Sequence, residues 1–230
     1  MKILKTLGCT VCLWCIAVPA AAETIAIIGT GDVGRALGPA FAAQGHTIVY
    51  GSRDPSRRGL ASLIEKTGPD ASAKTQAAAA ADADVIVLAV PGMLAGDIAR
   101  NLGDLSGKII IDPTNPMERS FMTFRHGVDT SNAEIIQAIA PDAHVVKAFN
   151  TLGWETMVVP ESAGGPVSIP LAGDSGSAKQ FVAELAEGMG LEPIDVGPVE
   201  HAHWIEGMLI LWINNRFSMR DAFDFHLRKN

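Results

Sequence analysis

The stretch "IAIIGTGDVGRAL" (residues 25–37) decides the fold class of this chain. A short apolar run ends in a glycine-rich turn, Gly29-x-Gly31-x-x-Gly34, which opens directly into a helical pattern. In such a turn the first glycine permits a tight bend, the second lets the backbone approach a pyrophosphate, and the third allows helix and strand to pack closely. The free N–H groups at the start of the helix then face the phosphates. The stretch therefore predicts a dinucleotide site formed by Gly29, Thr30, Gly31, Asp32, Val33 and Gly34.

The chain that follows repeats this alternation of strand and helix. Short apolar runs predict strands at 24–29, 46–51, 84–90, 108–112 and 144–149, with a weaker candidate at 71–75. Helical patterns separate them at 33–44, 55–66, 94–102 and 133–140, and the alanine run at 76–83 predicts one more short helix. Unbroken apolar runs are typical of strands covered on both faces. We therefore expect an α/β fold with a Rossmann-type, doubly wound, mainly parallel sheet and right-handed crossovers.

The last third of the chain predicts a C-terminal strand and helix extension. Patterns for a strand at 169–174, a helix at 175–188 and a strand at 191–197 precede a long amphipathic stretch that closes the chain. No linker is long enough to separate a second domain, so we expect a nucleotide-binding domain at 23–150 and an extension at 151–230 that completes the substrate pocket. The final stretch carries an apolar stripe at helical spacing, which indicates core packing or a homodimer contact: Trp204, Met208, Leu211 and Trp212.

The end of the second predicted strand indicates which dinucleotide is bound. An acid at this position binds the ribose hydroxyls of NAD and repels a 2′-phosphate, but here Gly51 is followed by Ser52 and Arg53. A hydroxyl and a guanidinium suit a phosphate dianion, and Arg57 adds a second positive charge nearby. We therefore expect NADP, with Arg58 as a spare cation. Asp54 leaves two alternatives open, because it can pull Arg53 away or cap the helix that starts at Pro55.

The first residues have the layout of a secretory signal peptide. Lys2 and Lys5 precede an apolar run from Thr6 to Val18, and Ala20-Ala21-Ala22 supplies small residues for cleavage. The run is too short to span a bilayer. We expect cleavage after Ala22, a leader at 1–22, a periplasmic or secreted protein and no membrane span in the mature chain. A misassigned start codon would instead leave the protein in the cytoplasm.

Charge and cysteine usage exclude several classes of partner. The formal net charge of −7 argues against nucleic acid and leaves the arginines near residue 55 as a local basic cluster. All three cysteines, Cys9, Cys12 and Cys15, lie in the predicted leader, so we interpret them as apolar fillers rather than metal ligands. His201 and His203 diverge if they lie on a helix, so no metal is assigned to them. The expected partner is a small-molecule redox substrate.

Four motifs together resemble the NADPH-dependent coenzyme F420 reductase family and the related cytosolic oxidoreductase domain of the six-transmembrane metalloreductases. They are "IAIIGTGDVGRAL", "VYGSRDP" (49–55), "DPTNP" (112–116) and "VVKAFNTLG" (145–153), in family order and spacing across nearly all of 24–215. The form "GTGDVG" and the wording "VVKAFNT" are nearer the metalloreductases, since F420 reductases usually carry an extra glycine in the first loop. Glu200, His201 and His203 stand where we would expect basic residues, which argues against binding of the anionic F420 tail.

The resemblance implies NADPH at the carboxyl edge of the strands, with hydride passing to a flavin or deazaflavin (F420-type) ring. It places the 2′-phosphate on Ser52, Arg53 and Arg57 and sets Ala89, Val90 and Pro91 against the cofactor. Around the nicotinamide it places Thr114, Asn115, Ala148 and Asn150. Such a transfer needs two rings stacked at about 3–3.5 Å and no general base. No nucleophile is therefore assigned, and the nicotinamide pocket of Asn115 and Asn150 forms the catalytic wall.

Two other functions remain open on the sequence. Lys147 and Asn150 suggest the catalytic pair of a carbonyl or imine reductase related to β-hydroxyacid dehydrogenases. Alternation along a strand would point them to opposite sides, so we interpret Lys147 as an ordinary charged residue at a strand end. The competing class is a non-catalytic NADP(H)-binding or sensor protein, because an exported chain would have to acquire NADPH outside the cytoplasm.

Overall fold

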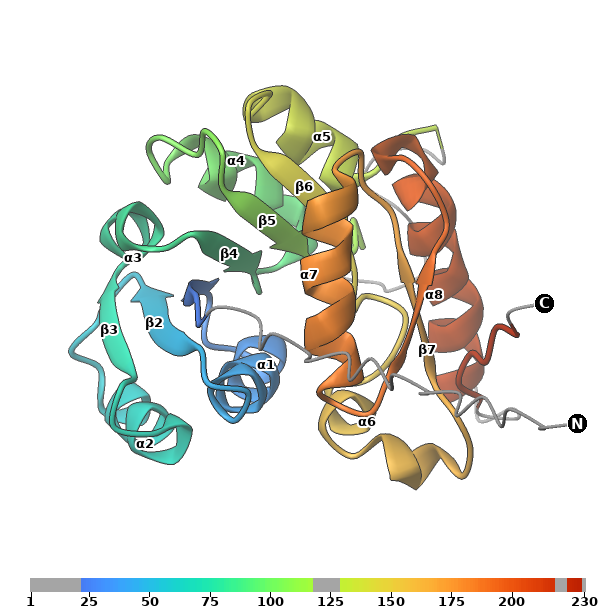
Figure 1. Cartoon of the computed structure of the whole chain (residues 1–230), viewed down its shortest axis with the longest axis horizontal. Coiled ribbons are helices and arrows are strands. Elements are labelled where there is room, and N and C mark those ends of the chain that lie inside the picture. Colours follow the sequence, from blue (N-terminus) through green and yellow to red (C-terminus); the bar gives the residue numbers. More distant parts are fainter. Residues whose placement is uncertain (1–21, 118–128, 218–222, 229–230) are drawn as a thin grey trace, which may run out of the picture.

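The computed structural model describes residues 22–117, 129–217 and 223–228, so the predicted leader and its three cysteines lie outside the described residues, apart from Ala22. Six strands form one parallel sheet in the order β3-β2-β1-β4-β5-β6 (Figure 1). They are β1 (Thr24–Ile28), β2 (Thr47–Ser52), β3 (Ser72–Thr75), β4 (Val85–Leu88), β5 (Ile109–Asp112) and β6 (His144–Lys147). The strand order turns back between β1 and β4, which is the crevice where such sheets bind ligands. The expected Rossmann-type α/β fold is confirmed.

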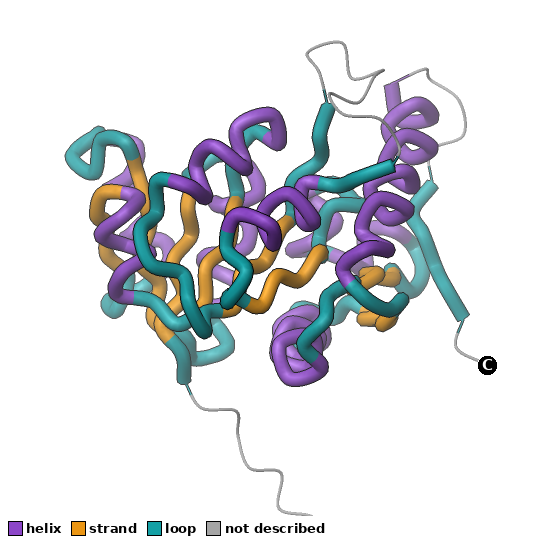
Figure 2. The backbone as a smooth tube through the Cα atoms, turned by 90° about the horizontal axis from the view of Figure 1, so that it is seen from above, coloured by secondary structure: helices purple, strands orange, loops and turns teal. Residues whose placement is uncertain are grey.

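Helices cover both faces of this sheet, as the tube view shows (Figure 2). They are α1 (Asp32–Ala42), α2 (Arg58–Thr67), α3 (Gln76–Asp82), α4 (Ala95–Arg100), α5 (Asn132–Ile139) and α7 (Gly176–Glu187). Successive residues of β1 belong to two different apolar clusters: Ile25 and Ile27 pack with α1, α2 and α7, whereas Ala26 and Ile28 pack with α3, α4 and α5. Burial on both faces explains why the strands are continuous apolar runs.

The C-terminal extension packs against β6. Its strands β7 (Ser168–Leu171) and β8 (Glu192–Asp195) form a separate parallel pair, joined to the main sheet by one antiparallel bridge between Lys147 and Ala172. The last helix, α8 (Ala202–Phe217), follows a short 3-10 turn at Val199–His201 and packs against α5 (Figure 1). Its first turns contribute Ala202 and Ile205 to the same apolar cluster as α4 and α5. The extension therefore reaches the carboxyl edge of the main sheet.

Two local elements differ from the sequence-based expectation. The helix expected at 55–66 begins only at Arg58, because the Asp54 carboxylate accepts hydrogen bonds from the Ser56 backbone N–H (3.0 Å) and hydroxyl (2.6 Å). These bonds hold the chain in a turn rather than a helix. Helix α6 (Trp154–Val158) and the 3-10 turn at Pro160–Ala163 were not predicted. Five residues are too few to show a helical period.

No helix in the described part of the chain is long and apolar enough to cross a membrane.

Candidate dinucleotide site

The glycine turn between β1 and α1 has the geometry that its sequence requires. Gly29 has φ +106°, and a Cβ placed there would lie 2.1 Å from the carbonyl oxygen of Ala89. A Cβ on Gly34 would lie 2.2 Å from the carbonyl oxygen of Gly29, so helix and strand pack backbone to backbone. A Cβ on Gly31, in contrast, would meet nothing within 4 Å. Gly29 and Gly34 are therefore needed for packing, whereas Gly31 borders open space at the start of α1.

A cavity of about 1200 Å³ opens in front of this turn. Eleven of the predicted cofactor residues line it: Gly29, Thr30, Gly31, Asp32, Val33, Ser52, Arg53, Arg57, Ala89, Val90 and Pro91. Gly34 is not in its wall because it packs beneath the turn. The cavity thus joins the glycine turn, the end of β2 and the segment after β4 into one site, at the crevice between β1 and β4.

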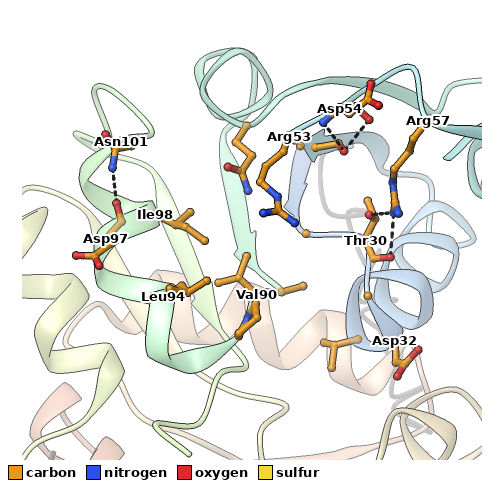
Figure 3. Close-up of a pocket in the computed structure, with 18 residues that line it drawn as sticks. Thr30, Asp32, Arg53, Asp54, Arg57, Val90, Leu94, Asp97, Ile98 and Asn101 are labelled. Carbon is orange, nitrogen blue, oxygen red and sulfur yellow. Dashed lines mark hydrogen bonds between the residues drawn. The ribbon is translucent and has the colours of Figure 1, made fainter. Parts of the chain in front are cut away.

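The turn after β2 presents one unpaired guanidinium to the cavity. Arg53 makes no ion pair or side-chain hydrogen bond with any described residue and points into the cavity (Figure 3). Asp54 bonds to Ser56 rather than to Arg53, and these two hydrogen bonds lower the pKa of Asp54. Both alternatives left open for Asp54 are wrong, because its carboxylate makes no hydrogen bond or ion pair with Arg53 and α2 begins at Arg58 with Arg57 as its N-cap. Arg53 is consequently available to a ligand.

Arg57 lies on the other side of the same turn and folds back over the glycine loop. Its Nη2 donates to the hydroxyl of Thr30 and, at 3.5 Å, to the carbonyl oxygen of Thr30 (Figure 3). The hydroxyl of Ser52 donates to the Asp54 carbonyl at 2.9 Å, within the turn. A phosphate bound by all three predicted residues would therefore compete with internal bonds at Ser52 and Arg57 but not at Arg53.

The wall of the cavity opposite the glycine loop was not predicted from the sequence. Leu94, Asp97, Ile98 and Asn101 line the cavity from the 3-10 turn Gly92–Leu94 and α4, facing Arg53 and Thr30 (Figure 3). Gln76, at the start of α3, also lines it. Their spacing could have been noticed, since Leu94 and Ile98, like Asp97 and Asn101, are four residues apart and share a helix face. The apolar pair gives this wall a surface suited to a flat base.

The four residues predicted for the nicotinamide half lie together, but outside the wall of this cavity. Asn115 and Asn150 pair through their amides: Asn150 Nδ2 donates to Asn115 Oδ1 at 2.9 Å, and Asn115 Nδ2 donates to the Asn150 carbonyl at 3.1 Å. Thr114 and Ala148 adjoin them and are buried. The amide pair therefore occupies the segment where the cavity would have to continue.

A strained residue sets the direction of this segment. Phe149 has φ +62°, the only positive φ outside glycine in the described chain, and its ring packs edge-on against Phe41 with centroids 6.0 Å apart. Non-glycine residues keep such a conformation only where the surroundings enforce it, and they are frequent at functional sites. The kink ends the alternation of β6. Asn150 thus reaches Asn115 and the carbonyl of Ile205, while Lys147 reaches the neighbouring Asp112.

The interpretation of Lys147 as an ordinary strand-end residue is wrong. Its side chain is completely buried, and its Nζ contacts Asp112 Oδ2 at 2.9 Å and Glu206 Oε1 at 2.6 Å. Both Lys147 and Asn150 contact α8 and the segment after β5, so they do not diverge as alternation predicted. The partners of Lys147 are 35 and 59 residues away in sequence, which is why no local pattern revealed them.

The two histidines near the C-terminus, His201 and His203, contact different residues. His201 Nδ1 lies 2.5 Å from the Val196 carbonyl, whereas His203 Nδ1 lies 3.5 Å from Glu134 Oε2, so the two rings have different partners. No group of three or more His, Cys, Asp or Glu side chains within 22–117, 129–217 and 223–228 is placed to hold a metal ion.

In the apolar stripe of the last helix, Trp212 is buried, but the side chains of Trp204 and Leu211 are 66% and 58% exposed.

The residues present fit an NADP molecule. The amide oxygen Oδ1 of Asn150 is buried without a hydrogen-bond partner among the described residues, and a buried acceptor of this kind requires a donor such as a carboxamide N–H. Gly31 leaves its cradle open where a Cβ would intrude, and Arg53 supplies an unpaired cation. Donor, acceptor and charge are thus arranged along one edge of the sheet, from the end of β2 to the end of β6.

Comparison with known proteins gives consistent matches. Residues 24–116 match the family model described as NADP oxidoreductase, coenzyme F420-dependent. The F420-dependent NADP reductase of Methanothermobacter thermautotrophicus is 32% identical over 216 residues, covering 86% of this chain and 92% of that protein. Metalloreductase STEAP3 of Rattus norvegicus is 33% identical over 192 residues, covering 83% of this chain but 37% of its own length. This chain therefore spans little more than a third of that metalloreductase.

A solved structure agrees with these matches. The crystal structure of a putative F420-dependent NADP-reductase from Arthrobacter sp. FB24 superposes with a TM-score of 0.83 and 31% sequence identity, covering 90% of this chain and 100% of that chain. The likeness includes the C-terminal extension as well as the main sheet, because the coverage exceeds the 24–116 range of the family model.

Proposed function

Since the chain belongs to the family of coenzyme F420-dependent NADP oxidoreductases, we propose that it transfers hydride between NADPH and a flavin or deazaflavin ring. By that membership it is an NADP-dependent oxidoreductase. The observation that carries the choice of NADPH is the unpaired Arg53 guanidinium in the wall of a cavity that also contains the glycine turn, whereas the acceptor is inferred from the family. A charge-assisted contact with the 2′-phosphate selects NADPH over NADH.

Each part of the chain has a positioning task in this reaction. The backbone N–H groups of the glycine turn and the start of α1 hold the pyrophosphate, and Leu94 and Ile98 cover the base. Asn150 Oδ1, which is buried without a partner among the described residues, would accept a hydrogen bond from the carboxamide and so orient the nicotinamide. The bound NADPH supplies the hydride itself, so the protein needs to align two rings and exclude water rather than to provide an acid or base.

The acceptor is a ring that stacks on the exposed face of the nicotinamide. One relative is named as an F420-dependent reductase, which supports a deazaflavin acceptor, and the motif resemblance adds a flavin as the other candidate. The 3-10 turn before α8 carries Glu200 and His201 rather than a basic cluster. Repulsion of an anionic tail by this segment favours an acceptor with less negative charge than F420, such as FMN.

The test is oxidation of NADPH followed by its absorbance in single-turnover mixing with F420, FMN and FAD in turn. The proposal expects rapid oxidation with at least one of these acceptors and a marked preference for NADPH over NADH. Tight NADPH binding with no oxidation by any of the three would contradict hydride transfer and support the non-catalytic binding protein instead.

A homodimer formed through α8 is part of the proposal. Trp204 and Leu211 expose large apolar side chains on this helix, and they are seven residues apart, which places them on one face. Exposed apolar residues that share a face mark interaction sites. Light scattering coupled to gel filtration should give a dimer for the natural chain and a monomer for Leu211→Glu. A monomeric natural chain would contradict this part of the proposal.

Export with cleavage after Ala22 is also proposed. Residues 1–21 are outside the description, but Glu23 is already fixed: its carbonyl accepts from Thr47 N (3.0 Å) and its N–H donates to His46 Nδ1 (3.2 Å). A cut before Glu23 therefore leaves β1 intact. The intact mass of protein isolated from its native cells should correspond to a chain that begins at Glu23, and a mass that includes the leader would favour the cytoplasmic alternative.

A further inference from the structure

Three charged side chains form a buried ion cluster that the proposed reaction does not use. Lys147 at the end of β6 lies between Asp112 at the end of β5 and Glu206 in α8, and the side chains of all three are at most 2% exposed. Lys147 Nζ also donates to the carbonyl oxygen of Thr114. The cluster therefore joins the main sheet, the segment after β5 and the C-terminal helix at one point.

Burial and neighbouring charges shift the pKa values of Lys147 and Glu206 in this cluster. Desolvation by itself lowers the pKa of Lys147, but the facing carboxylates of Asp112 and Glu206 outweigh it and raise that pKa, so the ammonium persists. Desolvation raises the pKa of Glu206, against the opposing attraction of Lys147. Buried ion pairs of this kind add little stability compared with well-packed apolar side chains. A role for this cluster must therefore come from the residues that it holds in position.

The cluster holds Thr114 on every polar atom. Asp112 Oδ1 accepts hydrogen bonds from the Thr114 N–H (2.9 Å) and hydroxyl (2.6 Å), and Lys147 Nζ donates to the Thr114 carbonyl oxygen. The hydroxyl of Thr114 also accepts from Asn132 Nδ2 at 2.7 Å. Asn132 is tied to Glu206 in turn, because its backbone N–H donates to Glu206 Oε1 at 2.9 Å. Two separate routes thus connect Glu206 to Thr114.

The same part of α8 also holds the other predicted nicotinamide residue. Asn150 Nδ2 donates to the carbonyl of Ile205, the residue before Glu206, at 3.3 Å, as well as to Asn115. Glu206 keeps its second oxygen, Oε2, buried and without a partner among the described residues. An unsatisfied carboxylate oxygen is expensive to bury, so the position of this side chain is enforced by its Oε1 contacts.

We propose that the buried ion cluster of Asp112, Lys147 and Glu206 fixes the Thr114–Asn115 segment against the nicotinamide, with Glu206 as a positioning residue supplied by the C-terminal helix. The inference rests on the proposed function, since Thr114 and Asn115 matter only if a nicotinamide lies there. It implies that α8 controls the geometry of hydride transfer without touching the adenosine half of the cofactor.

The test compares Glu206→Ala with Glu206→Gln. The alanine variant removes the acceptor shared by Lys147 and Asn132, whereas glutamine keeps an oxygen at the Oε1 position. Glu187→Ala is the matched control, because Glu187 is an exposed carboxylate at the end of α7 that does not line the cavity. Asn132→Ala is a second variant that keeps all three charges and removes the side-chain hydrogen bonds to Thr114 and Gly92. Thermal unfolding first shows which variants are folded.

Three readouts separate positioning from a general structural effect. Adenosine 2′,5′-bisphosphate reports the adenosine half alone, the fluorescence of bound NADPH reports the nicotinamide surroundings, and single-turnover oxidation reports hydride transfer. For Glu206→Ala and Asn132→Ala we expect bisphosphate affinity within about twofold of the natural protein, altered NADPH fluorescence and at least about tenfold slower oxidation. Glu206→Gln should recover most of the rate, and Glu187→Ala should match the natural protein.

Several results would overturn the inference. Natural fluorescence and rate in folded Asn132→Ala and Glu206→Ala would contradict it, as would equal losses for the bisphosphate and NADPH. A glutamine variant as slow as alanine would show that charge, not position, is what matters. A natural protein that binds neither ligand would contradict the proposed function as a whole, which distinguishes that failure from failure of the inference alone.

Discussion

Arg53 is the residue on which discrimination between the two nicotinamide cofactors depends. A hydrogen bond to a charged group contributes about 1.5–3 kcal/mol, so Arg53→Ala should weaken NADPH binding roughly ten- to a hundredfold and leave NADH binding almost unchanged. Titration of both cofactors by fluorescence measures the difference. Arg58→Ala is the matched control, because Arg58 is an exposed arginine at the start of α2 that does not line the cavity. Equal weakening of NADPH and NADH would contradict the phosphate assignment.

Two glycines of the same loop should respond in opposite ways to alanine. Gly31→Ala meets nothing within 4 Å and keeps an ordinary backbone conformation, so the thermal unfolding temperature should stay the same while NADPH binding weakens about tenfold or more. Gly29→Ala combines a positive φ with a Cβ 2.1 Å from a backbone oxygen, so it should lower the free energy of unfolding by at least about 3 kcal/mol. Unfolding curves with and without NADPH distinguish the two.

Residues differ in how far sequence could predict them. The glycine turn and Arg53 were predictable because their roles follow from residue type and from position relative to a neighbouring strand. Lys147 was not, because burial and partners come from Asp112 and Glu206, which only the folded chain brings near. The alternation argument for Lys147 and Asn150 failed at Phe149, whose positive φ breaks the strand period without a glycine to announce it.

At the scale of elements, Tyr50 connects β2 to both α1 and α2. Tyr50 is fully buried, its hydroxyl bonds to the Thr67 hydroxyl at 2.7 Å, and it packs so tightly on α1 that a Cβ on Gly38 would lie 2.0 Å from it. Desolvation by burial raises the pKa of Tyr50 from 10.0 to about 12. The folded state therefore keeps the phenol protonated where the unfolded state loses the proton.

This difference has a definite sign and pH window. A raised folded-state pKa gives stability that is complete below pH 10.0 and is lost as the pH rises from there to about 12. The loss amounts to roughly 2–3 kcal/mol from this one group. Tyr50→Phe should be less stable by about 1 kcal/mol at neutral pH, since it lacks the Thr67 hydrogen bond, and should become the more stable protein above pH 11. Urea unfolding at several pH values measures the crossover, and parallel curves would contradict it.

Two features of the elements could not be predicted from local sequence: the shortest helical segments and the face that α4 presents to the cavity. Helix α6 and the turn Pro160–Ala163 are too short for a period, and α4 was found as a helix but not as a cavity wall. What α4 faces is decided by the crossing of the chain over the sheet, which places it opposite the glycine loop. Type of element is thus a local property of the sequence, whereas the identity of a cavity wall is not.

For the molecule as a whole, the fold could be predicted because local and global signals agree. Apart from β3, each strand of the main sheet is an apolar run, each crossover is a helical pattern, and a parallel sheet covered on both faces is the arrangement observed. The separate pairing of β7 with β8, and their single bridge to β6 at Lys147, carried no comparable signal. That bridge also fixes the backbone next to the buried ion cluster, so the extension and the site are mechanically connected.

The hydrogen bonds of Glu23 and Thr24 predict where the folded unit begins. The carbonyls of Glu23 and Thr24 accept hydrogen bonds from Thr47 N (3.0 Å) and Asp84 N (3.1 Å), which tie β1 to both of its neighbours. A chain that begins at Glu23 keeps both bonds, so it should unfold at the same urea concentration as the full chain. A chain that begins at Ile25 loses both acceptors and should be less stable by about 1–3 kcal/mol, at about 0.5–1.5 kcal/mol for each bond. If the Glu23 chain were as unstable as the Ile25 chain, residues of the predicted leader would have to belong to the folded protein, and cleavage after Ala22 would be contradicted.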